Sequence, residues 1–130
     1  MVSIFSKIIK GEIPCYKVAE SETCFAFLDI NPLAKGHVLV VPKFEVDYIF
    51  DLDEETYIQL NLFAKKVAIA LKKAIPCSRI GVTVIGLEVP HVHIHLIPIN
   101  EVSDMNFSNK KLDFSKLELQ EIANSIAGFL

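Results

Sequence analysis

Three histidines alternate with aliphatic residues in the segment His91-Val92-His93-Ile94-His95-Leu96. Successive side chains of a β-strand point to opposite faces, so this spacing places three imidazoles in a row on one face and aliphatic side chains on the other. A helix would scatter the same residues around its axis, and the β-branched Val92 and Ile94 favour a strand. The segment therefore predicts a strand over residues 91–98 with one imidazole face and one aliphatic face.

The imidazole row suits two kinds of chemistry. Neighbouring charged imidazoles repel one another, so we expect most of the rings to be neutral at neutral pH, the form that acts as nucleophile, base or metal ligand. A tetrahedral metal ion needs converging ligands, whereas the outer α-carbons of the row lie about 13 Å apart, so a metal site would need help from another strand. In nucleophilic catalysis the middle ring attacks, a hydrogen bond fixes its second nitrogen, and the flanking rings hold the substrate. The row favours this second use.

The rest of the chain predicts an α+β fold with an antiparallel sheet. Strands are expected at 15–20, 23–30, 37–41, 79–86 and 91–98, and the apolar run of 37–41 indicates a central strand. Only the helix predicted at 54–74, with Asp53 as its cap, is long enough for a crossover. Shorter helices are expected at 3–9, capped by Ser3, and after the capping-box sequence that starts at Ser115.

The long predicted helix carries two apolar stripes. The expected core stripe contains Tyr57, Leu60, Ala64, Val67, Ala68 and Leu71. The second stripe contains Ile58, Leu62 and Ile69. Periodicity allows two interpretations of this second stripe: a face for self-association, or a wider stripe buried within one monomer.

Length and composition indicate one soluble globular domain that spans residues 1–130. The net charge of −3 gives no electrostatic case for binding duplex nucleic acid, and no apolar run reaches membrane-spanning length. The amino-terminal segment lacks the order of a signal peptide. Cys15, Cys24 and Cys77 are widely spaced and indicate free thiols in a reducing cytoplasm.

The segment from His91 to Ile97 matches the sequence signature of the histidine triad (HIT) family, in which three histidines alternate with hydrophobic residues. Residues 4–14, 26–32 and 36–43 also resemble segments of that family in the same order, so the resemblance covers about residues 3–99 and is strongest to its Hint branch. It implies a HIT-like fold, with a five-stranded antiparallel sheet joined to that of a second copy in a homodimer. It also implies binding of a purine nucleotide and hydrolysis or transfer at the α-phosphate, with no cofactor and no metal.

The resemblance also implies roles for individual residues. His93 is the expected nucleophile, which forms a nucleotidyl-histidine that water cleaves, and His37 is expected to orient the His93 ring through a hydrogen bond. His91 and His95 would contact phosphate oxygens and help the leaving group, and Asp29 would accept hydrogen bonds from the ribose hydroxyls. The pocket for the base would contain Ile4, Phe5, Ile8, Phe27 and Ile30. The hypothesis requires that the rings of His37 and His93 touch and that a cavity lies in front of His93.

Three features depart from the family pattern. Leu87 stands where a phosphate-contacting Gln is usual, and no Asn lies between Arg79 and His91 to replace a second amide. Glu88 stands where Hint relatives have a hydroxyl that assists the leaving group. Glu88 reaches the site only if the chain bends before Pro90. In the site its carboxylate would repel a phosphate, unless it is protonated or serves as a general acid for an amine leaving group. The alternative is a loop position in which Glu88 faces solvent. Ser3 and Ser6 replace cysteines that hold structural zinc in some relatives, so no zinc is expected there.

The leading hypothesis is a cytoplasmic homodimeric hydrolase of purine nucleoside phosphoramidates or nucleotidyl conjugates. The alternatives are a catalytically weak nucleotide-binding regulatory module, a dinucleoside polyphosphate hydrolase, and a metalloenzyme that uses the histidine row.

Overall fold

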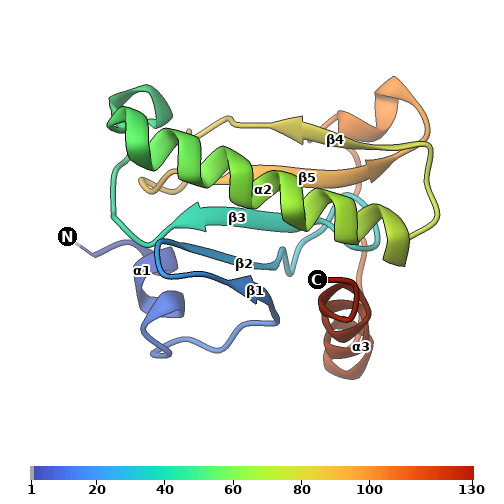
Figure 1. Ribbon diagram of the computed structural model, residues 1–130. Helices are drawn as coiled ribbons and strands as arrows, with labels where there is room; N and C mark the ends of the chain where they lie inside the picture. The colour runs from blue at the N-terminus through green and yellow to red at the C-terminus, as the bar shows by residue number, and fades with distance from the viewer. Residues whose placement is uncertain (1) are drawn as a thin grey trace.

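The computed structural model describes residues 2–130 and contains a five-stranded antiparallel sheet with helices on both faces (Figure 1). This confirms the predicted α+β class. The helices are α1 (Ile4–Ile9), α2 (Glu54–Ala74) and α3 (Lys116–Ala127), with short 3-10 helices at Ile49–Asp51 and Val102–Met105. The strands are β1 (Lys17–Glu20), β2 (Cys24–Leu28), β3 (Val38–Pro42), β4 (Arg79–Thr83) and β5 (Ile94–Ile99).

The strands lie in the order β1-β2-β3-β5-β4, and every neighbouring pair is antiparallel. Helix α2 makes the crossover from β3 to the edge strand β4, and β5 then returns between them. All five residues of β3 are buried, as its apolar run predicts for a central strand. The topology places β5, with its histidine, beside the centre of the sheet.

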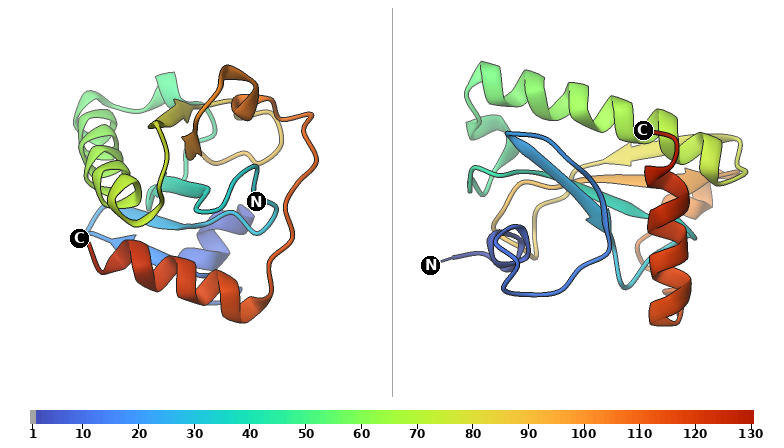
Figure 2. Two further views of the ribbon diagram at one scale, coloured as in Figure 1. Left: turned by 90° about the vertical axis from the view of Figure 1, so that its right-hand side faces the viewer. Right: turned by 60° about the horizontal axis from the view of Figure 1, so that its bottom comes forward.

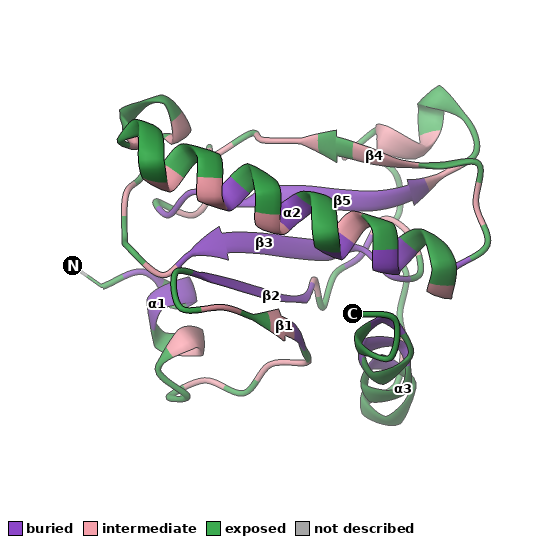
Figure 3. Cartoon of the chain, in the orientation of Figure 1, coloured by how far each residue is buried: buried purple, intermediate pink, exposed green. Residues whose placement is uncertain are grey.

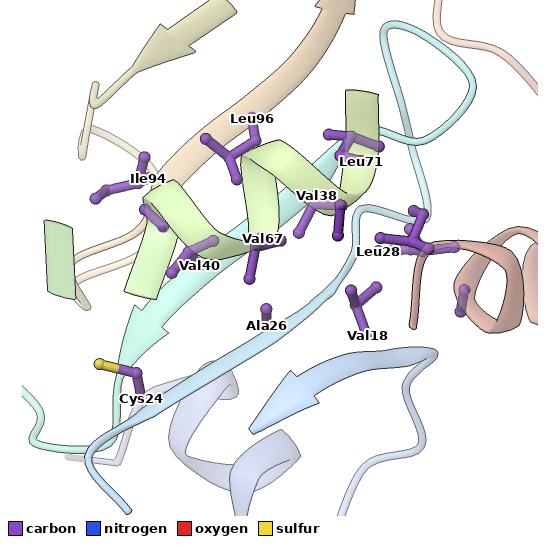
Figure 4. Close-up of a cluster of buried hydrophobic side chains, with 14 of the residues drawn as sticks. Val18, Cys24, Ala26, Leu28, Val38, Val40, Val67, Leu71, Ile94 and Leu96 are labelled. Carbon is purple, nitrogen blue, oxygen red and sulfur yellow. The ribbon is translucent and has the colours of Figure 1, made fainter. Parts of the chain in front are cut away.

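Side-chain alternation divides the core into two clusters, one on each face of the sheet. Helices α2 and α3 cover one cluster, which includes Ala26, Val40, Ile94 and Leu96 (Figure 4). On the other face α1 contributes to a second cluster, which contains Phe5, Phe25, Phe27, Leu39 and Val41. Because the aliphatic residues of the histidine segment belong to the first cluster, the imidazoles lie on the α1 face.

Strand β5 begins at Ile94, later than the predicted start at His91. Strand β4 already ends at Thr83, opposite His95, so no ladder partner remains for the preceding residues on that side. Gly86, with φ of 73°, turns the chain away from the sheet, and the Val92 N–H donates to the carbonyl of Val46 in a loop. The alternation nevertheless continues beyond the strand, because Val92 is buried with Ile94 in the cluster beneath α2.

Helix α2 agrees with most of its predicted core stripe. Leu60, Ala64, Val67 and Leu71 are buried, as is Ala70, which the prediction omitted. The prediction was wrong for Tyr57, which is 39% exposed.

The second stripe of α2 is uncovered (Figure 3). Ile58, Leu62 and Ile69 are half exposed or more, so a wider stripe buried within the monomer is wrong.

The predicted helix caps differ in outcome. Ser3 and Ser115 accept hydrogen bonds from the backbone N–H groups of Ser6 and Glu118, as expected of caps. Asp53 occupies the N-cap position of α2, but its side chain makes no capping hydrogen bond. Within residues 2–130, no helix has the length and apolar character needed to cross a membrane.

Candidate active site

A cavity of about 440 Å³ opens on the α1 face of the sheet. It is bordered by α1, the turn between β2 and β3, the loop before β5, and the segment between β5 and α3. Figure 2 shows that last segment passing along the side of the sheet away from α2. The cavity brings together six of the predicted site residues: His37, His93, His95, Asp29, Ile4 and Phe5. It is therefore the place where the sequence-based hypothesis can be examined.

Four predicted residues do not line this cavity. Phe27 and Ile8 belong to the core cluster behind Phe5, where the Phe27 and Phe5 ring centroids lie 5.5 Å apart. Ile30 is 64% exposed, and His91 is completely buried. Only for His91 does the structure contradict direct ligand contact, because both of its ring nitrogens already have hydrogen-bond partners. The contacts of Ile8, Phe27 and Ile30 with a base stay predictions, and Phe27 and Ile8 support the cavity lining from behind.

His93 presents one free ring nitrogen to the cavity. Its Nδ1 lies 2.7 Å from the backbone carbonyl oxygen of His91. Because a carbonyl only accepts, Nδ1 carries the proton, and in the neutral ring Nε2 then carries the lone pair. Phe5 and His95 hold the ring from two sides, each with its ring centroid 5.0 Å away.

His95 presents the opposite function, an N–H group. The backbone N–H of Leu33 donates to Nδ1 of His37 at 3.0 Å, so a neutral His37 ring carries its proton on Nε2. That Nε2 donates to Nδ1 of His95 at 3.0 Å. His95 therefore accepts at Nδ1 and, when neutral, carries its own proton on Nε2.

Both Nε2 atoms are open to the cavity. Within residues 2–130 no buried side-chain nitrogen or oxygen is left without a hydrogen-bond partner, and neither Nε2 of His93 nor Nε2 of His95 makes such a bond. Since both residues line the cavity, both atoms are accessible from it. The site thus offers a lone pair and an N–H donor side by side.

Burial keeps the supporting rings neutral, as the sequence predicts for most of the row. Loss of hydration lowers the pKa of His37 to about 3 and the pKa of His95 to about 4. Burial likewise lowers the pKa of His91. At neutral pH these three rings therefore have one proton each, and their hydrogen bonds decide which nitrogen holds it.

The predicted hydrogen bond between His37 and His93 was wrong. His37 uses its two ring nitrogens on Leu33 and His95, so it has none left for His93. The main-chain carbonyl of His91 fixes the His93 ring instead. Of the two conditions placed on the hypothesis, the contact between the rings of His37 and His93 is not met, whereas the cavity in front of His93 is present.

His91 is a structural member of the row, so its predicted phosphate contact was also wrong. Its Nε2 donates to the carbonyl of Pro42 at 2.8 Å, and its Nδ1 accepts from the hydroxyl of Ser3 at 2.7 Å. Glu45 accepts at 2.6 Å from the Ser6 hydroxyl and at 2.6 Å from the Ser3 N–H. These hydrogen bonds, first that of the Ser6 hydroxyl, lower the pKa of Glu45 to about 2. This polar junction ties α1 to the carbonyl that orients His93.

Asp29 lines the cavity next to the His37–His95 pair. Its Oδ1 accepts from the N–H of Asn31 at 2.8 Å, and its Oδ2 lies 3.7 Å from Nε2 of His37. Burial raises the pKa of this carboxyl group. One carboxylate oxygen thus remains for hydroxyl donors of a ligand.

Asp29, His37 and His95 each place a potential metal-ligand atom within 4.8 Å of the others. The hydrogen bonds argue against an ion there. A metal on Nε2 of His37 would replace the proton donated to His95, while Nδ1 of the same ring already accepts from Leu33. The ring would then be an anionic imidazolate, so the group as arranged favours a proton over a metal ion.

The cavity also contains residues that sequence reasoning left uncertain or missed. Glu88 lines it, so the chain does bend before Pro90, as this position requires. Leu87 lines it too and offers no donor to a phosphate. Phe107 and Lys111 come from the segment between β5 and α3, and no periodicity in that segment signals their position.

The fold and site define an α+β protein whose sheet presents a pair of oriented imidazoles to a ligand cavity. Residues 10–102 match the model of the HIT domain, and the chain therefore belongs to the HIT family. The resemblance identified from the histidine segment and the HIT-like fold are thus confirmed.

Individual relatives agree with this family. The chain is 36% identical over 118 residues to adenosine 5'-monophosphoramidase HNT1 of Saccharomyces cerevisiae, which covers 88% of this chain and 75% of the relative. It is 41% identical over 103 residues to the adenosine 5'-monophosphoramidase hnt1 of Schizosaccharomyces pombe, a match that covers 75% of this chain and 74% of the relative. A crystal structure of a Hit-like protein from Bartonella henselae superposes with a TM-score of 0.86 at 34% identity, covering 98% of this chain and 96% of that one.

Proposed function

We propose that this protein hydrolyses or transfers at the α-phosphate of purine nucleoside phosphoramidates or nucleotidyl conjugates through a nucleotidyl-histidine intermediate. The observation that carries the proposal is the pair of Nε2 atoms on His93 and His95, one a lone pair and the other an N–H group, which open onto one cavity. The two yeast relatives named as adenosine 5'-monophosphoramidases support a phosphoramidate as the substrate class.

In the first step, the lone pair on Nε2 of His93 attacks phosphorus. The new N–P bond forms as the bond from phosphorus to the leaving group breaks, and a leaving amine takes a proton from water as it departs. Nε2–H of His95 donates to a phosphoryl oxygen, on which negative charge grows. In the second step, water attacks the phosphorus of the nucleotidyl-histidine and releases a proton to solvent. The N–P bond breaks, and the nucleotide leaves with the lone pair on Nε2 of His93 restored.

The remaining lining residues suit the nucleoside. Ile4 and Phe5 offer an apolar wall for the base, and Oδ2 of Asp29 offers an acceptor for ribose hydroxyls. His37 and His91 act as positioning residues, His37 through His95 and His91 through its carbonyl on His93.

The test is acid-quench trapping of a labelled nucleotidyl-protein adduct from an adenosine phosphoramidate. We expect the adduct in the wild type and none in His93→Ala. A regulatory module would bind the mononucleotide tightly without adduct or turnover. A dinucleoside polyphosphate hydrolase would form the adduct faster from a dinucleoside polyphosphate than from the phosphoramidate.

We also propose that the chain acts as a homodimer through the second stripe of α2 and the edge strand β4. The stripe is exposed, β4 ends the sheet, and Val82 on β4 is 62% exposed. An uncovered apolar face next to an unpaired strand edge is the surface that a second copy can cover.

We propose, further, that residues 1–130 form a single HIT domain. Helix α3 lies beyond the residues matched by the family model, yet Leu119, Ile122 and Ile126 are buried in the same cluster as α2 and the sheet. A helix that shares the core belongs to the same cooperative unit.

A further inference from the structure

The cavity is short of positive charge for the anion that it is proposed to bind. Its described lining contains two carboxylates, Asp29 and Glu88, and a single permanently cationic side chain, Lys111. The rings of His37 and His95 are neutral because burial lowers the pKa of each, and His93 must be neutral to attack. A nucleotide phosphate entering the cavity therefore meets one full positive charge, on Lys111.

Lys111 belongs to a segment that is fixed against the site. The N–H of Leu112 donates to the carbonyl of Pro32 at 2.9 Å, which ties the segment to the turn before His37. Phe107 packs edge-on against His95, with ring centroids 5.0 Å apart, and against His37 at 6.3 Å. The segment thus covers the imidazole pair that presents the N–H donor to the cavity.

The ammonium of Lys111 is held in place by this segment. Its Nζ donates to the backbone carbonyls of Phe107 and Asn109 and lies 5.8 Å from the centroid of the Phe107 ring. An ammonium group has three N–H donors, so one remains for a ligand. Lys111 lines the same cavity as Asp29, His37 and His95, so this remaining donor is available to a ligand bound there.

We propose that Lys111 is the phosphate-binding cation of this site. The inference rests on the proposed function for the class of ligand. Leu87, at the position where the family resemblance leads us to expect a phosphate-contacting Gln, lines the cavity without offering a donor. The segment after β5, most of which lies outside the residues 10–102 matched by the family model, supplies the missing donor.

The experiment compares the affinity of the full chain for AMP and for adenosine by titration calorimetry. Lys111→Ala should weaken AMP binding by about tenfold or more, because a hydrogen bond to a charged group is lost. Adenosine has no phosphate, so its affinity should change by less than about twofold. Lys110→Ala is the matched control, since Lys110 is adjacent, exposed and absent from the cavity lining, and it should change neither affinity. Lys111→Arg should retain part of the AMP affinity.

Three results would overturn the inference: AMP affinity that is unchanged in Lys111→Ala, equal losses for AMP and adenosine, or no AMP binding by the wild type. Equal losses would show that Lys111 only holds the segment in place. Adduct trapping on the same samples separates this inference from the proposed function. Selective loss of AMP binding in Lys111→Ala, with no adduct in the wild type, would sustain the phosphate-binding role and reject the enzymatic one.

Discussion

At the scale of single residues, the position of one proton distinguishes two chemically similar rings. His93 and His95 sit with ring centroids 5.0 Å apart, yet one is bonded to a carbonyl and the other to a ring N–H. The first ring can only be the nucleophile of the pair, and the second can only be the donor, as long as both are neutral. The two residues should therefore fail in different ways when replaced.

We expect His93→Ala to abolish the adduct and His95→Ala to leave it detectable. Removal of one donor to a developing oxyanion costs about 10²- to 10³-fold in kcat, whereas removal of the nucleophile removes the covalent route altogether. Single-turnover kinetics with acid quench measures both. Comparable adduct yields in the two variants would contradict the assignment of roles.

The polar junction around His91 makes a residue-scale prediction about stability. Ser3→Ala removes the donor to Nδ1 of His91, whose ring is completely buried, and so leaves a buried acceptor unpaired. We expect a loss of about 1–3 kcal/mol in the free energy of unfolding, measured by urea denaturation. Ser125→Ala, at an exposed position of α3, serves as the control and should change it by less than about 0.5 kcal/mol.

At the scale of elements, the sequence pattern predicted those features that depend on residues close together in the chain. The caps Ser3 and Ser115 and the long helix α2 follow from spacing alone. The alternation of the histidine segment also held, even where the strand itself had ended. The start of β5 could not be read from the sequence, because it depends on where β4 stops at Thr83.

The turn between β2 and β3 gives a prediction with an internal control. Gly36 has φ of 89°, and a Cβ added there would lie 2.9 Å from Cγ1 of Ile75 and 3.0 Å from Cδ1 of Leu71. Gly11 has φ of 81° and nothing within 4 Å of an added Cβ. Gly11→Ala should therefore cost about 1–2 kcal/mol for its backbone conformation, and Gly36→Ala clearly more. Urea denaturation of the two variants measures the difference, and equal losses would contradict the packing seen at Gly36.

At the scale of the whole molecule, the site was only partly predictable. The residues that face the cavity from the matched segments, His93, His95, His37 and Asp29, follow from the resemblance. The partners of those residues do not, because the contact of His37 with His95 and the contact of Phe107 with both join parts distant in sequence. Lys111 lies in a stretch without periodicity, and only the course of the chain from β5 to α3 brings it to the cavity.

Buried neutral imidazoles make the stability of the molecule depend on pH. Unfolded histidines bind protons below about pH 6.5, whereas His95 in the folded chain does so only near its pKa of about 4 and His37 near its pKa of about 3. The unfolded state thus binds more protons as the pH falls, and the free energy of unfolding should fall with it. Between pH 7.5 and 5.5, a range above the ordinary pKa values of carboxyl groups, we expect each of these two rings to lower the free energy of unfolding by about 1 kcal/mol. Urea unfolding at both pH values measures this change, and a constant free energy would contradict neutral burial.

The exposed stripe of α2 gives a prediction for assembly. Leu62 is 59% exposed, so Leu62→Glu should leave the fold of the monomer intact while placing a charge in the proposed dimer contact. Sedimentation velocity should show a dimer for the wild type and a monomer for Leu62→Glu. Leu117→Glu is the matched control, because Leu117 is 70% exposed on α3, and this variant should remain dimeric. A monomeric wild type would reject the proposed homodimer.

The hydrogen bond from the Leu33 amide to His37 has a wider consequence. A main-chain group in a surface turn selects the tautomer of one ring and, through it, the tautomer of a second ring some sixty positions later in the chain. Backbone amides do not change when side chains mutate, proline excepted. The backbone conformation of the turn thus determines which nitrogen of His37 and of His95 carries the proton. Side-chain substitutions in the turn can therefore leave the proton donor and the nucleophile of the site unchanged.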